Sequence, residues 1–311
     1  MIDHASGADP RRLVIAAAHS PALGRIAGHD VHPPVVAAMA QARQLVSAFD
    51  PEVVVFFGAD HRRAFRAVIP AFAVAVSATS RGDRGAPEGS YDVPATLARE
   101  LIEGVLQQGV DVALAHRPAL DHAFGLTAVD LFGAIDAVAT IPVFVNAASP
   151  PLPTWPRAAA LGRAVGSVLA ERTERILFVG SGGLAHDLPG FYAVDDGLER
   201  TEEELLEHNA RLNAELRRPG FTVGSQWDAE LLAGLSGTAD EWLNIIGRDV
   251  GERAGNGANE ALTWVAAWAA AGQPLTTLAY DYEPIWGGSG AGVVASAWAV
   301  ARASGVTDEG A

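Results

Sequence analysis

The chain has 311 residues, 49% of them hydrophobic and 19% charged, so it can bury a sizeable core as one large domain or two modest ones. Its 37 acidic and 22 basic residues give a net charge of −15, which argues against nucleic acid or an anionic membrane as a partner. The absence of cysteine excludes disulfides, thiolate metal ligands and a cysteine nucleophile. Together with a polar N-terminus and no long apolar run, it predicts a soluble, cytoplasmic protein.

Strands alternating with ten- to fifteen-residue helical patterns favour an α/β fold, a largely parallel mixed sheet flanked by helices. We expect residues 1–12 to form a flexible leader, 13–303 a single α/β catalytic domain, and 304–311 a frayed tail. The expected strands are 13–18, 53–57, 72–76, 111–115, 141–145, 176–179 and 275–280. The expected helices are 35–49, 95–107, 157–171, 202–217, 227–235, 239–246, 258–271 and 292–303, with a further helix preceding residue 141.

Three of the expected buried strands each end near a histidine: 13–18 before His19, 53–57 before His61, and 176–179 before His186. If these strands are parallel neighbours, the three imidazoles converge at the carboxyl edge of the sheet. Open α/β sheets present their sites at that edge. A Gly-rich turn, Gly180-Ser181-Gly182-Gly183, separates the third strand from His186 and allows backbone to approach a bound group closely.

His122 also lies in a tight turn after an apolar run. Any single histidine of this kind is more often held in its turn by a hydrogen bond than used in chemistry. Four in equivalent positions favour a shared site that ligates a metal or shuttles protons. His29 and His32, together with Asp30, are a second possible metal cluster, but an exposed loop is the favoured interpretation there.

Glu260 opens an otherwise apolar helix and is the best candidate for a carboxylate ligand. The alternative, that it stabilises the first turn of that helix with Gly257 as the cap, remains equally open. Two histidines and one carboxylate suit both a non-haem Fe(II) oxygenase and a hydrolytic zinc site. A phosphate loop or a Ser181 nucleophile is weakly supported, because the Lys of a Walker loop and the G-x-S-x-G elbow are both missing.

Two other segments complete the expected site. The Gly-, Pro- and Ser-rich residues 80–90 form a loop that composition predicts to be exposed and that can serve as a lid. From residue 201 onward the pattern becomes helical and more acidic, and this C-terminal segment carries Glu260 to the site.

Five separated motifs resemble the class III extradiol ring-cleavage dioxygenases. The similarity runs in the same order from about Leu13 to Gly288, and within the superfamily it is greatest to the 2,3-dihydroxyphenylpropionate 1,2-dioxygenase type. The motifs are AHSPALG around His19, VVVFFGADH around His61, LDHAFG around His122, RILFVGSGGLAHDLP around His186 and NEALTWVAAW around Glu260.

The resemblance implies Fe(II) held by His19, His61 and Glu260, with His186 as the base that deprotonates a catechol and His122 as the acid that assists ring opening. It implies cleavage of a 3-substituted catechol with O2, in a homo-oligomer that serves aromatic catabolism. The implied substrate is 3-(2,3-dihydroxyphenyl)propionate or 2,3-dihydroxycinnamate. The alternatives are a different catechol or aminophenol, a Zn-dependent hydrolase, and a non-catalytic binding module on the same fold.

Four residues beside the histidines have open roles. Asp60 and Asp121 each precede a histidine, and each is expected either to orient it or simply to form a turn. Arg62 and Arg63 stand where the propionate-catechol enzymes have a Tyr-Asn pair, and Asp187-Leu188-Pro189 also departs from that pattern. Either arginine can bind a substrate carboxylate through two hydrogen bonds, but we slightly favour at least one pointing to solvent.

Overall fold

The structure is a computed structural model and describes residues 9–19, 24–26, 29–193, 198 and 200–305. Most of the expected leader and tail, residues 1–8 and 306–311, lie outside the described residues. Within the described parts of the chain, no helix has both the length and the apolar character needed to cross a membrane.

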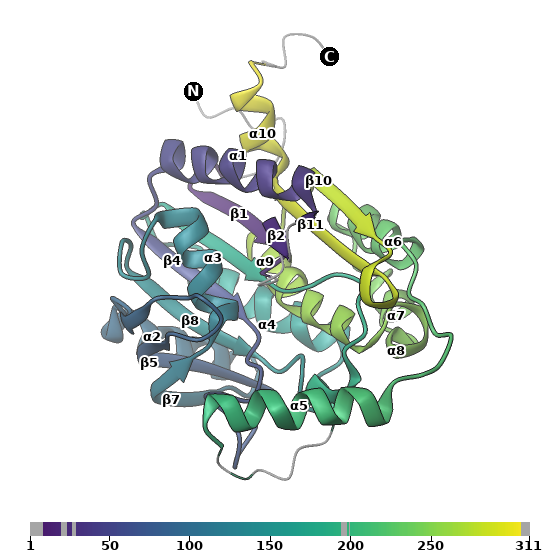
Figure 1. The fold of residues 1–311 in the computed structure, drawn as a ribbon. Coiled ribbons are helices and arrows are strands. Elements are labelled where there is room, and N and C mark those ends of the chain that lie inside the picture. The colour runs from purple at the N-terminus through teal and green to yellow at the C-terminus, as the bar shows by residue number, and fades with distance from the viewer. Residues whose placement is uncertain (1–8, 20–23, 27–28, 194–197, 199, 306–311) are drawn as a thin grey trace.

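The molecule is built on a mixed sheet with the strand order β10-β11-β1-β9-β4-β8-β5-β6, in which β7 also pairs with β5 (Figure 1). The central strands β1, β9, β4 and β8 are mutually parallel, and both flanks continue with antiparallel pairs. The strands of this sheet are β1 Arg12–Ala17, β4 Val53–Gly58, β5 Phe72–Arg81, β6 Glu88–Ser90, β7 Ala113–Leu120, β8 Thr140–Val145, β9 Ile176–Ser181, β10 Leu275–Glu283 and β11 Ser289–Ser296. A separate pair is formed by β2 Gly24–Ile26 and β3 His29–Val31.

Helices cover both faces of the sheet, which therefore lies between two apolar layers (Figure 1). Along β1, Leu13 and Ile15 belong to the apolar layer that includes α1 and α3, whereas Val14 and Ala16 belong to the layer that includes α4 and α9. This burial on both sides explains why the central strands are continuous apolar runs. The helices are α1 Pro33–Phe49, α2 Ala95–Gln107, α3 His122–Phe132, α4 Trp155–Val168, α5 Glu202–Leu216, α6 Gln226–Leu235, α7 Leu243–Ile246, α8 Val250–Arg253, α9 Leu262–Ala271 and α10 Ala297–Ala303, with 3₁₀ turns η1 Pro189–Phe191, η2 Asn256–Ala261 and η3 Ile285–Gly287.

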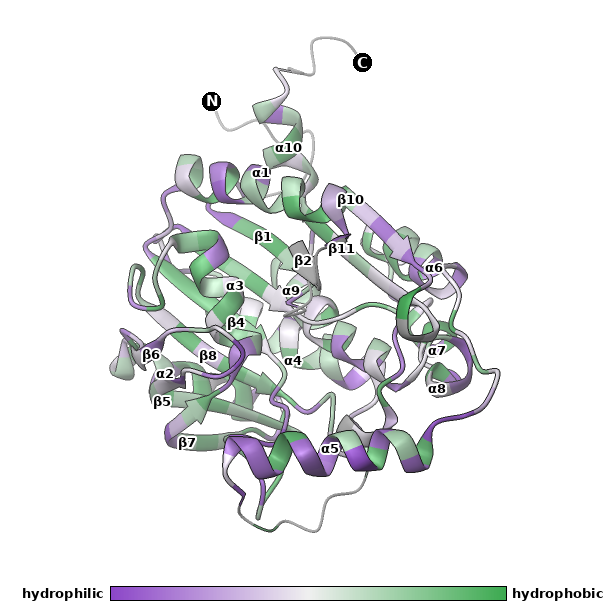
Figure 2. Ribbon diagram, in the orientation of Figure 1, coloured by the Kyte–Doolittle hydropathy of each residue, from purple (hydrophilic) through white to green (hydrophobic). Residues whose placement is uncertain are grey.

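Helices α9 and α5 differ in hydropathy (Figure 2). Helix α9 has nine of its ten residues buried between the sheet and α4. Helix α5 carries a capping box at Thr201, buries only Leu205 and Asn209, and is rich in hydrophilic residues (Figure 2). It packs on η1, the turn that follows the His186 segment.

The structure departs from the sequence expectations at three places in the fold. Residues 292–303 are not one helix: the first part belongs to β11, which pairs antiparallel with β1 and β10, and only Ala297–Ala303 is helical. Residues 80–90 are not loop throughout, because β5 and β6 pair across their two ends in a hairpin; most of the residues in between are exposed as expected, but Asp83 and Ala86 are buried. His32 is also buried rather than loop-exposed, and its Nδ1 donates to Asp281 at 3.0 Å.

Candidate metal centre

The three strands that precede His19, His61 and His186 are parallel neighbours in the order β1-β9-β4, as the sequence predicted. Their carboxyl ends therefore share one edge of the sheet. The ring centroids of His19 and His61 are 5.4 Å apart, and a ring nitrogen of His122 lies within 4.8 Å of a nitrogen from each of these two.

Glu260 lies close to two of these histidines. Its Oε1 lies 2.9 Å from Nε2 of His61, and its Oε2 lies 3.4 Å from Nε2 of His19. The side chain is buried and sits in η2, where Oε2 also accepts the backbone N–H of Gly183 at 2.6 Å. Its described hydrogen bonds thus go to groups across the site and not to the first turn of α9.

The other nitrogen of each ring is held by the protein. Nδ1 of His19 contacts Ser181 Oγ at 3.1 Å, and because Ser181 donates to the Ala123 carbonyl, its oxygen accepts from Nδ1–H. Nδ1 of His61 donates to Asp121 Oδ2 at 2.9 Å, and the same oxygen accepts the His61 backbone N–H. Such partners fix the ring tautomer and direct both Nε2 atoms toward Glu260.

The charges of this cluster suit a cation. Burial lowers the pKa of His19 to about 4, against the opposing charge of Glu260. Burial also disfavours charge on His61, but the carboxylates of Asp121 and Glu260 outweigh it and raise its pKa to about 10. Burial raises the pKa of Glu260 as well, yet His19 and His61 outweigh burial and hold this pKa well below its usual range. Glu260 is therefore an anion placed between two imidazoles.

Two sets of three ligands are possible here. His122 stacks on His61 with ring centroids 4.7 Å apart, so His122 as well as Glu260 lies beside the His19–His61 pair. Nδ1 of His122, however, donates to Asp83 Oδ2 at 2.7 Å. Two imidazoles with one carboxylate match the donors of a non-haem Fe(II) site. Glu260 and His122 are therefore both candidates for the third ligand, and the donor chemistry favours Glu260.

His186 is linked to Glu260 through Tyr192. Its Nδ1 donates to the Leu184 carbonyl at 2.8 Å, so Nε2 is the nitrogen left for chemistry. Nε2 contacts the Tyr192 hydroxyl at 3.0 Å, and Tyr192 donates to Glu260 Oε1 at 2.6 Å. A Cβ added at Gly257 would lie 2.1 Å from His186 Nε2, so only glycine there leaves room for the ring. Sequence reasoning missed Tyr192, which follows an irregular turn with no pattern to mark it.

Asp121 and Asp60 have different surroundings. Asp121 contacts the His61 ring, whereas Asp60 accepts the backbone N–H groups of Arg63, Ala64 and Phe65. Asp60 therefore organises the turn after His61, which is the turn-forming alternative for this residue.

Neither arginine after His61 points to solvent, contrary to the favoured expectation. Arg62 is 1% exposed and donates to the Ala193 carbonyl at 2.5 Å. The Arg63 side chain is fully buried; it donates to the His61 carbonyl at 2.8 Å and pairs with Glu202 of α5 at 2.5 Å. Arg63 thus ties the metal-centre turn to α5 instead of presenting a free guanidinium to a substrate.

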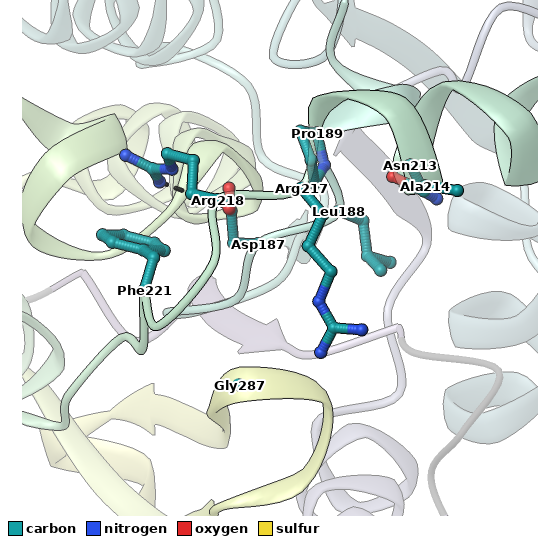
Figure 3. Close-up of a pocket in the computed structure, with 9 residues that line it drawn as sticks. All are labelled: Asp187, Leu188, Pro189, Asn213, Ala214, Arg217, Arg218, Phe221 and Gly287. Carbon is teal, nitrogen blue, oxygen red and sulfur yellow. Dashed lines mark hydrogen bonds and ion pairs between the residues drawn. The ribbon is translucent and has the colours of Figure 1, made fainter.

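A pocket of about 290 Å³ borders the segment that follows His186 (Figure 3). Its wall includes Asp187, Leu188 and Pro189, and the Arg217 side chain extends into it from the end of α5. Arg217 forms no hydrogen bond or ion pair with the described residues, whereas Arg218 pairs with Asp187. None of the converging histidines lines this pocket, so we assign it no part of the metal centre.

Comparison with known proteins identifies the family of this chain. Residues 13–293 match the family described as the catalytic LigB subunit of aromatic ring-opening dioxygenase. The chain belongs to this family. It is therefore a metal-dependent dioxygenase that opens the ring of a catechol with O2, and the histidine cluster lies within the matched region.

Curated relatives of this LigB-family dioxygenase carry the name 2,3-dihydroxyphenylpropionate/2,3-dihydroxicinnamic acid 1,2-dioxygenase. One from Mycobacterium sp. (strain MCS) is 38% identical over 254 residues, 75% of this chain and 80% of the relative. One from Rhodococcus sp. is 35% identical over 277 residues, 82% of this chain and 87% of the relative. The crystal structure of an uncharacterised Escherichia coli K12 protein shares the fold, with a TM-score of 0.58 and 14% identity over 91% of this chain and 99% of that one.

Proposed function

We propose that this enzyme is an Fe(II)-dependent extradiol dioxygenase in which His19, His61 and Glu260 hold the iron. The observation that carries the proposal is the approach of two Nε2 atoms to the two oxygens of one buried carboxylate. When bound, iron(II) supplies the redox chemistry that lets a catechol react with O2. Asp121 and Ser181 support the ligand histidines by accepting from their Nδ1–H groups.

The proposed substrate is a 3-substituted catechol, cleaved next to its hydroxyls with both atoms of O2 entering the product. The names of relatives 35–38% identical to this chain favour 3-(2,3-dihydroxyphenyl)propionate or 2,3-dihydroxycinnamate. We place the reaction in cytoplasmic aromatic catabolism, in line with the absence of cysteine, and expect a homo-oligomer from the family resemblance.

Two further imidazoles supply the acid–base chemistry in this proposal. His186 keeps its Nδ1 proton on the Leu184 carbonyl, so its Nε2 accepts a proton from a catechol hydroxyl. His122 keeps its Nδ1 proton on Asp83, so the proton donated as the carbon skeleton opens is a second one, carried on Nε2 of the cationic ring. The two rings adjoin different members of the Glu260–His61 pair: His122 stacks on His61, whereas His186 contacts Tyr192, which bonds Glu260.

Anaerobic loading with Fe(II), followed by a panel of substituted catechols in air, tests this function. We expect O2 uptake and a yellow product absorbing in the near-visible region, fastest with the carboxylated catechols. His122→Ala and His186→Ala should keep their iron and lose most activity, whereas Glu260→Ala should lose iron. Turnover supported by zinc without O2 uptake would instead establish a hydrolase, and an iron-free His186→Ala protein would reverse the assigned roles.

A further inference from the structure

We propose that Asp83 is the positioning residue of His122: it fixes the ring tautomer and orientation from the β5–β6 hairpin. The inference rests on the acid role proposed above for His122. Asp83 lies in the segment that sequence composition predicted to be an exposed loop, and nothing in its local sequence marks it for this role.

The contact itself is short and buried. Oδ2 of Asp83 lies 2.7 Å from Nδ1 of His122, and both residues are 5% exposed. A carboxylate oxygen can only accept, so the proton is on Nδ1 and the ring presents Nε2 to the substrate. One face of the His122 ring stacks on the His61 ring, with the two ring centroids 4.7 Å apart. One hydrogen bond and one stacking contact therefore set the direction of Nε2.

The carboxylate does not serve its own turn. An aspartate in a hairpin commonly accepts backbone N–H groups of that hairpin, but in the described residues the Asp83 side chain accepts only from His122 and lies near Arg63. Its second oxygen, Oδ1, is buried with no hydrogen-bond partner among the described residues. A buried acceptor left unpaired destabilises the folded state. The one hydrogen bond described for this carboxylate goes to the His122 ring and not to the hairpin, which supports a positioning role.

Two neighbouring contacts hold the hairpin at this distance. Arg63 Nε lies 3.6 Å from Asp83 Oδ2 while its Nη1 donates to the His61 carbonyl, so one guanidinium links the hairpin to the metal-centre turn. On helix α3, a Cβ added at Gly125 would lie 2.7 Å from Cβ of Ala86, so glycine allows the hairpin to pack directly on the helix that begins at His122.

A double-mutant cycle tests whether Asp83 acts through His122. In the iron-loaded enzyme we expect Asp83→Leu to lower kcat about 100-fold, with KM and iron content within about twofold of wild type. Asp83→Asn keeps an acceptor for Nδ1–H and should lose only about 10-fold. In the His122→Ala background, Asp83→Leu should change kcat by less than about twofold. Glu88→Gln, an exposed change on the same hairpin, is the matched control and should be silent.

A second measurement needs no turnover. In zinc-loaded protein labelled with ¹⁵N-histidine, Nδ1 of His122 should be fully protonated in wild type, whereas Asp83→Leu should show a mixture of Nδ1–H and Nε2–H tautomers, with the signal identified by its loss in His122→Ala. An equal loss of kcat in both backgrounds, or an unchanged tautomer, would overturn the role of Asp83. A wild-type enzyme that opens no catechol would refute the proposed function, and the tautomer measurement would still decide the Asp83–His122 coupling.

Discussion

His61 and Glu260 are 199 positions apart in the chain, yet Nε2 of His61 lies 2.9 Å from Oε1 of Glu260. The contact joins the turn after β4 to the η2 turn before α9. It brings a titratable ring and an anion together inside the protein, where opposite charges interact more strongly than in water. Metal binding should therefore depend on the charge of Glu260 more than on its size.

Replacing Glu260 with glutamine tests this dependence. Glu260→Gln keeps the shape of the side chain and an oxygen for the Gly183 N–H, but it removes the negative charge. We expect the Fe(II) dissociation constant to rise at least about 100-fold, measured anaerobically against a competing chelator. Glu252→Gln, an exposed change, should leave it unaltered. Unchanged affinity in Glu260→Gln would make His122 the third ligand.

The pKa of His61 predicts a pH dependence of metal binding. Although burial disfavours its charge, Asp121 and Glu260 raise this pKa to about 10, so at pH 7 a metal must displace one proton. His19, with a pKa of about 4, is already neutral. We expect the apparent zinc affinity to rise about tenfold per pH unit between pH 6 and 8, and a flat profile would contradict the pairing.

The same shift has a consequence for the stability of metal-free protein. The folded pKa of His61 lies above the ordinary value of 6.5, so the folded state holds the proton more tightly than the unfolded chain does. The stabilisation of the folded state by this proton is fully present below about pH 6.5 and is lost as the pH rises through about 10. The free energy of unfolding, measured with denaturant in the presence of a chelator, should fall over this pH range. Asp121→Asn should make that fall smaller, because it removes the charge that raises the His61 pKa most.

The part of the fold that positions the site was predictable because its signals are local. β4 and β9 are buried on both faces, which makes each a continuous apolar run, and the polar residue that follows such a run marks the edge of the sheet. Helix α2 was predicted with both ends correct, at Ala95 and Gln107, because its apolar positions recur with helical spacing.

The missed features depend on partners far away in the chain. The residues of β11 are mainly Gly, Ala, Val and Ser, a composition that fits a helix or a strand, and pairing with β1 and β10 decides between them. Asp83 and Tyr192 belong to irregular segments whose sequence specifies a turn but not the direction of a side chain. Their contacts with His122 and Glu260 become visible only once the hairpin and η1 are packed in place.

Ser181 supports His19 in the structure, and its removal should weaken metal binding. Ser181→Ala deletes the oxygen that accepts from His19 Nδ1–H at 3.1 Å, so the ring loses its fixed tautomer. We expect about a tenfold loss of metal affinity with little change in unfolding midpoint. Thr127→Val removes a hydroxyl 2.9 Å from Ser181 Oγ, one step farther from the ring, and should cost much less. Equal losses in the two variants would argue for general loosening of the core instead.

Asp228 makes the stability of the His186 segment sensitive to pH. It is fully buried in α6, where Oδ1 accepts the Ala185 N–H at 2.8 Å and Oδ2 accepts the Tyr280 hydroxyl at 2.9 Å. Burial, only partly opposed by these two hydrogen bonds, raises its pKa to about 7. The folded state therefore binds a proton that the unfolded chain releases near pH 3.8. The resulting stabilisation is fully present below about pH 3.8 and is lost as the pH rises through about 7.

Asp228→Asn separates this contribution from the others. The amide oxygen still accepts the Ala185 N–H, but the side chain no longer ionises, so the variant lacks the fall in stability between pH 5 and 8. We expect the difference in unfolding free energy between wild type and variant to change by on the order of 2 kcal/mol over that range. Asp240→Asn, at an exposed position paired with Arg163, should show no such change. A pH-independent difference would mean that Asp228 stays ionised in the fold, held by Ala185 and Tyr280 despite its burial.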